Sequence, residues 1–386
     1  MRITRRFRTV ATIGAIVLLA ASACGRSDGK EPAQPAGHQG HEAGAIPAAA
    51  PLRAGERFVE LSIARPYTPQ APAGATDEYR CFILDPGLRA SAFLTGSQFL
   101  PQNADVVHHA ILFQVPAEGV PEITRIDAES DGEGWRCFGD AGVDDAEWVG
   151  SWAPGANETL LDARVGHQVK AGGRIVIQIH YNTLALPKDG TASDRSGVRL
   201  RLSESPDLRP ITTQRLVAPV ELPCAADESG PLCDRAAAVE DVSKRFGPQA
   251  GSTVGRLAQR CAAGKPAAGS TQSCTYPVRG NVLVYASAGH MHLLGRKITV
   301  ELNPGTPQAR VLLDIPEYNF DDQSLRPLAA PVELRSGDTL TVTCTHDVAL
   351  RKQLPQFKEL PARYVVWGEG TSDEMCLGLL LTTPKA

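Results

Sequence analysis

Short apolar segments that end at turn-forming residues run through most of this 386-residue chain. In Arg174–Tyr181, isoleucines at every second position alternate with Val176, Gln178 and His180, so the two sets of side chains leave opposite faces of a strand. Many such segments, separated by Pro, Gly, Asn and Asp, are typical of β-sandwiches. Helical periodicity is scarce, and Ala236–Phe246 is a candidate short helix. The sequence therefore predicts an all-β fold of antiparallel sandwiches.

The length of the chain allows about two domains. Strand-like segments begin near Phe58, and the polar stretch Ser203–Thr212, which contains two prolines, interrupts them. A second series of strand-like segments follows. We therefore expect two tandem sandwiches, one over residues 58–205 and one over residues 213–386.

The first 23 residues have the pattern of an export signal. Four arginines precede the short apolar stretch Val10–Ala21, which is too short to span a bilayer comfortably. Small residues then lead directly to Cys24, as at a bacterial lipoprotein cleavage site. We expect an exported protein of the cell envelope, anchored to the membrane by lipid at Cys24, with residues 24–57 as a flexible tether. Ordinary signal cleavage remains the alternative, because Ala21 stands where leucine is more usual.

Charge and cysteine content restrict the partners and the compartment. The formal net charge is −4, and removal of the four signal arginines makes it more negative, so no basic surface remains to bind nucleic acid. An even number of cysteines after Cys24 in an exported chain argues for up to four disulfides. Eight cysteines allow roughly a hundred pairings, so the spacing alone leaves the connectivity open. These cysteines are Cys81, Cys137, Cys224, Cys233, Cys261, Cys274, Cys344 and Cys376.

Two motifs near the C-terminus suggest a metal site. In GHMHLLGRK, His290 and His292 are two residues apart in a strand-like segment, so their imidazoles leave the same face and can converge on one ion. In GEGTSDEMC, Met375 supplies a thioether beside Cys376. Two histidines with a methionine favour copper over zinc. Taken alone, each motif has a structural alternative, since a lone methionine more often fills a core.

A second group of histidines lies in the first half of the chain. His108 and His109 open the segment VVHHAILFQV, and His180 closes the isoleucine strand. Neutral imidazole suits copper and zinc alike. Adjacent histidines on a regular strand point to opposite faces, so both can reach one ion only where the strand bends or bulges. Structural, hydrogen-bonded histidines are the alternative.

In this order, the motifs HH, QIHY, HxHLLGRK and DEMC resemble those of the copper type II, ascorbate-dependent monooxygenases. The resemblance covers Phe58 to Pro384, and the C-terminal half is more similar to the dopamine-type branch. It implies two jelly-roll-like sandwiches that face each other across a cleft, with two copper ions per chain. An ascorbate-like donor would reduce both ions, and O2 with a small organic substrate would complete the reaction.

The resemblance also assigns roles to single residues. It implies that Gln178 lines the cleft and that a Cys344–Cys376 disulfide helps to fix Met375. The electron-supplying copper would be held by His108, His109 and His180, and the oxygen-binding, catalytic copper by His290, His292 and Met375.

Three positions depart from the pattern of the peptidylglycine enzymes of this family. Ala288 stands where those enzymes carry a basic residue, and Leu377 and Leu379 stand where they hold the peptide carboxylate. Peptide amidation is therefore not expected, and a less polar substrate is. The sequence predicts a copper-dependent monooxygenase that hydroxylates a C–H bond. The alternatives are a non-catalytic copper-binding or copper-buffering lipoprotein, and a structural sandwich with incidental histidines.

Several other residues are expected to be structural. His167 lies in a turn-rich segment and is expected at the surface, whereas His346 follows Cys344 and is expected to play a structural part. Trp135, Trp148 and Trp152 are expected to pack in the core or at a domain edge, with a substrate wall as the lesser alternative.

Overall fold

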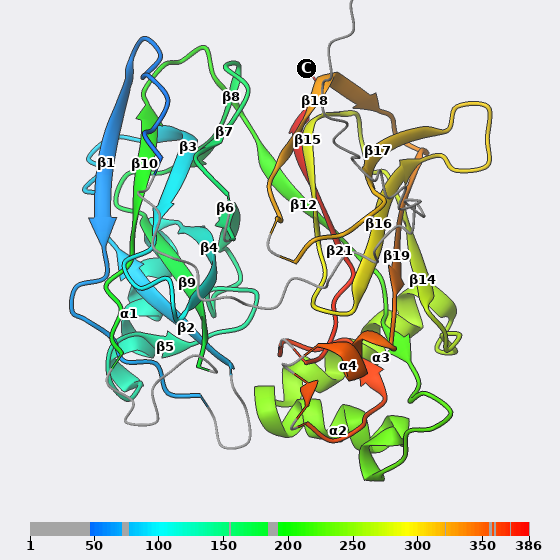
Figure 1. Ribbon diagram of the computed structural model, residues 1–386. Helices are drawn as coiled ribbons and strands as arrows, with labels where there is room; N and C mark the ends of the chain where they lie inside the picture. Colours follow the sequence, from blue (N-terminus) through cyan, green and yellow to red (C-terminus); the bar gives the residue numbers. More distant parts are fainter. Residues whose placement is uncertain are drawn as a thin grey trace, which may run out of the picture. The chain divides into compact units, whose positions relative to one another are not determined.

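The computed structural model describes residues 47–71, 77–153, 156–183, 192–320, 322–354, 357–358, 360–370 and 372–385 (Figure 1). The expected signal, Cys24 and most of the expected tether lie outside these residues. The described residues lie in one compact unit, and strands dominate it, so the predicted all-β fold is confirmed. Within the described part of the chain, no helix combines the length and apolar character needed to cross a membrane.

Over the described residues, the first sandwich contains eleven strands in two facing sheets, one α-helix and one short 3-10 helix. Its elements are β1 (Glu56–Ser62), β2 (Asp77–Leu84), β3 (Ala92–Leu100), β4 (Val107–Val115), η1 (Ala117–Gly119), α1 (Val120–Glu129), β5 (Trp135–Arg136), β6 (Glu147–Trp152), β7 (Thr159–Leu160), β8 (Val165–Val169), β9 (Arg174–Asn182), β10 (Gly197–Ser203) and β11 (Arg209–Pro210). One sheet has the order β1-β10-β3-β8-β11, with β7 paired to β3, and the other has the order β5-β2-β9-β4-β6. Every pairing is antiparallel except that of β11 with β8.

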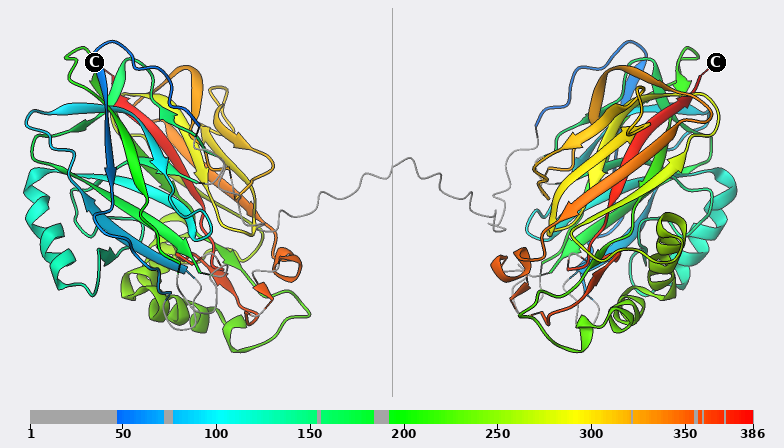
Figure 2. Two further views of the ribbon diagram at one scale, coloured as in Figure 1. Left: turned by 60° about the vertical axis from the view of Figure 1, so that its left-hand side comes forward. Right: turned by 90° about the vertical axis from the view of Figure 1, so that its right-hand side faces the viewer.

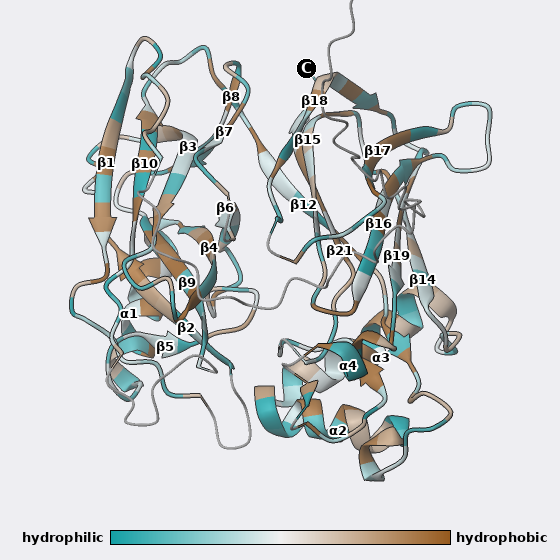
Figure 3. Ribbon diagram, viewed as in Figure 1, coloured by the Kyte–Doolittle hydropathy of each residue, from teal (hydrophilic) through white to brown (hydrophobic). Residues whose placement is uncertain are grey.

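Strand β9 shows why this sandwich closes. Its three isoleucines are fully buried in the core between the two sheets, where they meet Leu94 and Leu200. Burial of each such side chain contributes about 1.5–3 kcal/mol relative to exposure. Val176 faces the other way and packs with Ile123 of α1, which covers the outer face of the sheet. The predicted alternation along β9 is therefore confirmed, and Figure 3 shows hydrophobic residues along β4 and β9.

The second sandwich follows the same plan and carries a helical insertion. Its elements are β12 (Thr212–Val217), β13 (Glu221–Leu222), η2 (Pro231–Cys233), α2 (Arg235–Phe246), α3 (Pro248–Ala262), β14 (Thr271–Pro277), β15 (Val282–His290), β16 (Gly295–Leu302), β17 (Arg310–Ile315), β18 (Arg326–Leu334), β19 (Thr339–His346), α4 (Leu350–Gln353), β20 (Val365–Val366) and β21 (Leu377–Pro384). Its sheets have the orders β12-β21-β15-β18 and β14-β19-β16-β17, and β13 pairs with β20.

The insertion between β13 and β14 is more helical than the sequence suggested. The expected helix is α2, whose first turn is capped by the Asp234 side chain. Gly247 ends α2 with a positive φ, and Pro248 begins α3, which was not expected. Both helices lie with α4 at one end of the second sandwich (Figures 1 and 2).

The two sandwiches meet along an apolar seam. Leu161 and Val165 of the first pack with Tyr285 and Leu381 of the second, and the Thr213 hydroxyl donates to the Trp148 carbonyl over 2.7 Å. Strand β10 ends and β12 begins at the two ends of the predicted boundary stretch. The limits of the two domains remain a prediction.

Four disulfides join all eight cysteines that follow Cys24. The expected bond between Cys344 and Cys376 is present, and the pairings that the sequence left open are Cys81–Cys137, Cys224–Cys233 and Cys261–Cys274. A fully paired set of this kind is typical of an exported protein.

The expectation for His167 was wrong. This residue lies inside β8 rather than in a turn, and it is 1% exposed. Val165 and Val169 leave the same face of the strand and are also buried. The turn that the sequence suggested begins only after Val169, so His167 is carried inward with its neighbours. Its Nδ1 lies 3.6 Å from a carboxylate oxygen of Glu147.

Candidate metal centres

A bulge in β4 brings the two adjacent histidines together. Val107 pairs with Tyr181, but His109 already pairs with His180, so His108 is an extra residue in the ladder. A bulge of this kind redirects side chains that would otherwise alternate. The Nδ1 atoms of His108 and His109 lie 3.2 Å apart. The bulge that both histidines would need in order to reach one ion is therefore present.

His180 of the neighbouring strand completes a buried triad. Its Nδ1 lies 3.1 Å from Nδ1 of His109, and one ligand nitrogen from each of the three rings falls within 4.8 Å of the others. An ion about 2.0–2.1 Å from each imidazole nitrogen, as in zinc sites, needs ligand nitrogens roughly 3–4 Å apart. The triad therefore fits a three-imidazole metal ion.

The surroundings of the triad fix the orientation and charge of its rings. His180 donates from Nε2 to the Asp77 carboxylate over 2.8 Å, which leaves its Nδ1 lone pair facing His109. The Tyr79 ring stacks on His180 at 4.2 Å, and its hydroxyl donates to the Glu369 carbonyl over 2.6 Å. Burial, followed by the neighbouring His180 and His108, holds the pKa of His109 well below its usual value. A neutral ring is the form that binds a metal.

The second histidine pair lies where β15 ends. His290 is the last residue of the strand, and His292 follows it outside the strand, so the expected strand geometry holds for His290 alone. The two rings are nevertheless 5.2 Å apart. Strand β21 pairs His290 with Leu377, two residues after Met375, which is 8% exposed. Pairing of β15 with β21 thus carries Met375 toward the histidines from a distant part of the sequence.

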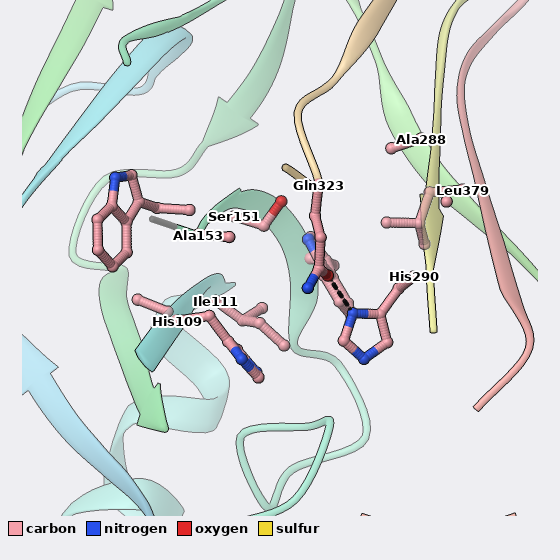
Figure 4. A pocket seen from close by; sticks show the side chains of 12 residues that line it. His109, Ile111, Ser151, Ala153, Ala288, His290, Gln323 and Leu379 are labelled. Atoms are coloured by element: carbon pink, nitrogen blue, oxygen red, sulfur yellow. Dashed lines mark hydrogen bonds between the residues drawn. The ribbon is translucent and has the colours of Figure 1, made fainter. Parts of the chain in front are cut away.

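Both histidines of this pair have Nδ1 occupied. Nδ1 of His290 is hydrogen-bonded to Oε1 of Gln323 (Figure 4), and the Gln323 amide donates to the Phe320 carbonyl over 2.7 Å. Nδ1 of His292 donates to the Asp373 carbonyl over 3.2 Å, since a carbonyl can only accept. In His290 and His292, Nε2 is therefore the nitrogen that could hold a metal ion, whereas in His180 it is Nδ1. Burial lowers the pKa of His290 to about 3 and also lowers that of His292.

The carboxylate of Glu374 connects the two chain segments that carry this second centre. It accepts hydrogen bonds from the backbone amides of His292 (2.9 Å), Leu294 (2.6 Å) and Met375 (3.2 Å). Nε2 of His346 lies 3.3 Å from Oε2 of the same carboxylate, and the structural role expected for His346 stays a prediction. Burial raises the pKa of Glu374, but the hydrogen bond and charge of His346 outweigh this, so the pKa is lowered. The DEMC motif drew attention to Met375, and sequence reasoning missed Glu374.

The helical insertion holds the same loop through Asp373. Arg245 of α2 makes two hydrogen bonds to the Asp373 carboxylate, at 2.9 and 2.6 Å, and Arg363 adds a third at 3.1 Å. The Asp373 side chain is 2% exposed. Because its carbonyl accepts from His292, the helix α2 is coupled to the second centre through one residue. No signal in the sequence connects Arg245 with Asp373, which lies 128 positions later.

The two centres face one another at close range. The rings of His109 and His290 are 5.8 Å apart, and Phe320 stacks on His108 at 4.6 Å. Beside these rings lies a cavity of about 30 Å³, whose wall includes Trp148 and Trp152. The lesser alternative for these two tryptophans, a place in a substrate wall, thus gains support, whereas Trp135 is buried in the core.

Gln178 lies apart from this cavity. It is 2% exposed, and its amide lies 3.5 Å from both the Cys137 sulfur and the Asp140 carbonyl. It shares the outer face of β9 with His180. Its expected place in the wall of a cleft stays a prediction.

The comparisons with known proteins concern the C-terminal part of the chain. Residues 265–382 match the family model described as copper type II ascorbate-dependent monooxygenase, C-terminal domain. Dopamine beta-hydroxylase of Rattus norvegicus is 28% identical over 117 residues, which are 30% of this chain and 17% of that protein. Tyramine beta-hydroxylase of Caenorhabditis briggsae is 30% identical over 109 residues, 27% of this chain and 16% of that protein. Residues 265–382 are therefore similar to the C-terminal domain of the copper type II, ascorbate-dependent monooxygenases.

The match covers the second centre and stops short of the first. It includes His290, His292 and Met375, and it begins after His180. The chain spans about a sixth of the length of the curated relatives that it matches. Among solved structures, an allantoicase aligns over 81% of this chain and 90% of its own, at 12% identity and a TM-score of 0.19. That score is too low to support an argument.

Proposed function

We propose that this chain is a copper-dependent monooxygenase with two copper ions. His108, His109 and His180 hold one ion, and His290, His292 and Met375 hold the other. The reaction hydroxylates a C–H bond of a small organic substrate: the substrate, O2, two electrons and two protons give the alcohol and water. An ascorbate-like reductant supplies the electrons. The observation that carries this proposal is the buried imidazole triad, whose His109 ring lies 5.8 Å from His290 of the family-matched centre.

The donor sets suit different tasks. Bound copper supplies one-electron transfer at the first centre and activation of O2 at the second. Three imidazoles accept copper in either oxidation state, whereas the thioether of Met375 favours Cu(I). Burial lowers the pKa of His109, His290 and His292, which favours their neutral, metal-binding form. Asp77, Gln323 and the Asp373 carbonyl fix the orientation of His180, His290 and His292. Such hydrogen-bond partners of ligating histidines typically change metal affinity by about 10- to 100-fold.

The relatives leave the substrate open. By their names, two of them act on dopamine and tyramine. The shared segment supports the reaction type for this chain, and the identity of the molecule hydroxylated has to come from the walls of its own cavity.

Oxygen uptake tests this proposal. Copper-loaded protein with ascorbate should consume O2 in step with the formation of hydroxylated product from a panel of small aromatic and aliphatic compounds. Replacement Met375→Ile should abolish product formation while copper remains at the triad. A protein that binds copper but forms no product from any compound would instead be a copper-binding or copper-buffering protein.

We further propose that the protein is held in the cell envelope by lipid at Cys24. The four disulfides support export, and the small residues before Cys24 support lipid attachment. Cys24→Ala should release the protein from the membrane fraction. Equal membrane retention of this variant would contradict the lipid anchor.

A further inference from the structure

A groove lined by three arginines lies between two sheet edges of the second sandwich. Strand β12 is the outermost strand of one sheet and β14 is the outermost strand of the other. The lining of the groove comes mainly from β12, α3, β14 and the segment that follows β14, and it includes Arg215, Arg260 and Arg279. The groove has a volume of about 660 Å³, and it shares no lining residue with the cavity beside His290.

The positive charge of this groove is not balanced by the protein. None of the described residues that line it carries a carboxylate. Arg215, Arg260 and Arg279 are exposed and form no ion pair within the described part of the chain, whereas Arg235 and Arg245 of α2 each pair with a buried acid. A concave surface of one charge sign attracts ligands of the opposite sign. Because the whole chain has a net charge of −4, this positive charge is a local feature of the groove.

Contacts around the groove hold two of the three arginines in place. The Cys261–Cys274 disulfide joins α3 to β14, and beside it the Arg260 guanidinium lies over the Tyr276 ring at 4.4 Å, which is a favourable cation–π distance. The Tyr276 hydroxyl donates over 2.6 Å to the carbonyl of the last residue of β12 and accepts over 3.0 Å from the amide of that residue. Arg215 of β12 donates to a backbone carbonyl of the first sandwich over 3.3 Å. Side chains that are already ordered lose less entropy when a ligand binds.

We propose that this groove binds a small soluble molecule that carries at least two anionic groups, either carboxylates or phosphates. One guanidinium can donate two parallel hydrogen bonds to a single carboxylate or phosphate, so three arginines suit a ligand with several such groups. The volume lies within the range of about 300–1,000 Å³ that is usual for small-molecule sites. None of the residues that line the groove takes part in the metal centres, so the site is independent of the proposed function.

A small molecule fits this groove better than a polymer does. Nucleic acid binds along a longer basic stripe or face, and the negative net charge of the chain opposes such a partner. A membrane surface would contact side chains that protrude, whereas these arginines line a concave space between two sheet edges. A soluble ligand can enter that space and reach more than one arginine.

Three compounds built on one ring test the ligand class: benzene-1,3,5-tricarboxylate, benzoate and 1,3,5-tris(hydroxymethyl)benzene. The carboxylates of the first compound point away from one another, so it does not chelate copper. Calorimetry on copper-loaded protein at low salt should show that the tricarboxylate binds about tenfold or more tightly than benzoate, because it can form two more ion pairs. The neutral compound should not bind, and added salt should weaken the tricarboxylate. Benzoate that binds as tightly as the tricarboxylate, or a tricarboxylate that does not bind, would overturn the inference.

Two variants of helix α3 test the place of binding. Arg260→Gln and Arg256→Gln remove the same charge from the same helix, but Arg256 bonds to Ser252 and Thr253 and does not line the groove. Arg260→Gln should weaken binding of the tricarboxylate about threefold or more, and Arg256→Gln should leave it unchanged. Equal weakening by both variants, or none by Arg260→Gln, would refute the site. Arg279→Gln provides the same test if Arg260→Gln does not fold, as judged by circular dichroism.

Vesicles of phosphatidylglycerol distinguish a soluble ligand from a lipid head group. The variant Cys24→Ala, which removes the proposed lipid anchor, should still bind the tricarboxylate. It should show no attachment to these vesicles that depends on Arg260. Attachment that requires Arg260, in a protein that does not bind the tricarboxylate, would contradict the soluble ligand and assign the groove to the membrane surface.

Discussion

Replacing Arg245 with methionine should weaken the fold and the second copper centre together. The arginine makes two hydrogen bonds to Asp373, and the two side chains are 13% and 2% exposed. Loss of one partner from a buried ion pair costs about 3–5 kcal/mol. Arg363 still contacts Asp373 at 3.1 Å, so the expected loss for Arg245→Met is near the low end, about 3 kcal/mol.

The same substitution should also lower the copper affinity of the second centre, because it loosens the Asp373 carbonyl. That carbonyl fixes His292 over 3.2 Å, and loosening such a partner typically lowers metal affinity about 10- to 100-fold. Copper at the triad should be unaffected, because the triad makes none of these contacts. Denaturant unfolding measures the first effect, and competition with a Cu(I) chelator measures the second.

Arg125→Met is the matched control for this experiment. Arg125 pairs with Glu122 and Glu129 of its own helix α1, but its side chain is 52% exposed. Exposed pairs of this kind contribute little to stability, so its unfolding curve should not change measurably. The reasoning is refuted if Arg245→Met unfolds like the unaltered protein, or if both centres lose copper affinity to the same extent.

Three further predictions follow from the same contacts. Asp77→Asn should lower copper affinity at the triad about 10- to 100-fold and leave the second centre intact, because Asp77 orients only His180; equal loss at both centres would count against this. In metal-free protein, His109 and His292 have pKa values below that of an unfolded histidine, which is about 6.5. The contribution of these two neutral rings to the free energy of unfolding should therefore be complete above about pH 6.5 and fall on acidification, by up to about 1.4 kcal/mol per pH unit for each ring. A free energy of unfolding that does not change between pH 7 and 5 would contradict this. Replacing Cys344 and Cys376 together with serine should cost about 3–4 kcal/mol for a separation of 32 residues, against about 2–3 kcal/mol for Cys224 and Cys233, separated by 9; the reverse order would contradict the loop argument.

The sequence predicted what depends on local periodicity. The alternation of isoleucines in β9 identified both faces of a strand, and the same alternation placed His180 opposite the core. It also showed what His108 and His109 would need, namely a bulge, without showing that the bulge exists. The strand end at His290 was not visible either, since nothing in the letters Gly-His-Met-His distinguishes a strand from the turn that follows.

Contacts between distant segments were beyond sequence reasoning. Glu374 binds three backbone amides of two segments about 80 positions apart. Arg245 contacts Asp373 from helix α2, which lies before the family-matched residues 265–382. Burial of His167 depended on where β8 ends. Ala288 and Leu379 indicated an apolar wall near His290, whereas only the fold shows that Trp148 and Trp152 of the other sandwich line the same cavity.

X-ray absorption at the copper edge of the fully reduced protein tests the central claim most directly. The account predicts copper bound by imidazole at both centres and by sulfur at one, so the spectrum should contain a sulfur shell that disappears in Met375→Ile while the imidazole scattering remains. Replacement of His108 and His180 by alanine should leave the sulfur shell in the spectrum. A spectrum without sulfur in the unaltered protein, or one that Met375→Ile does not change, would contradict the assignment of two distinct copper centres.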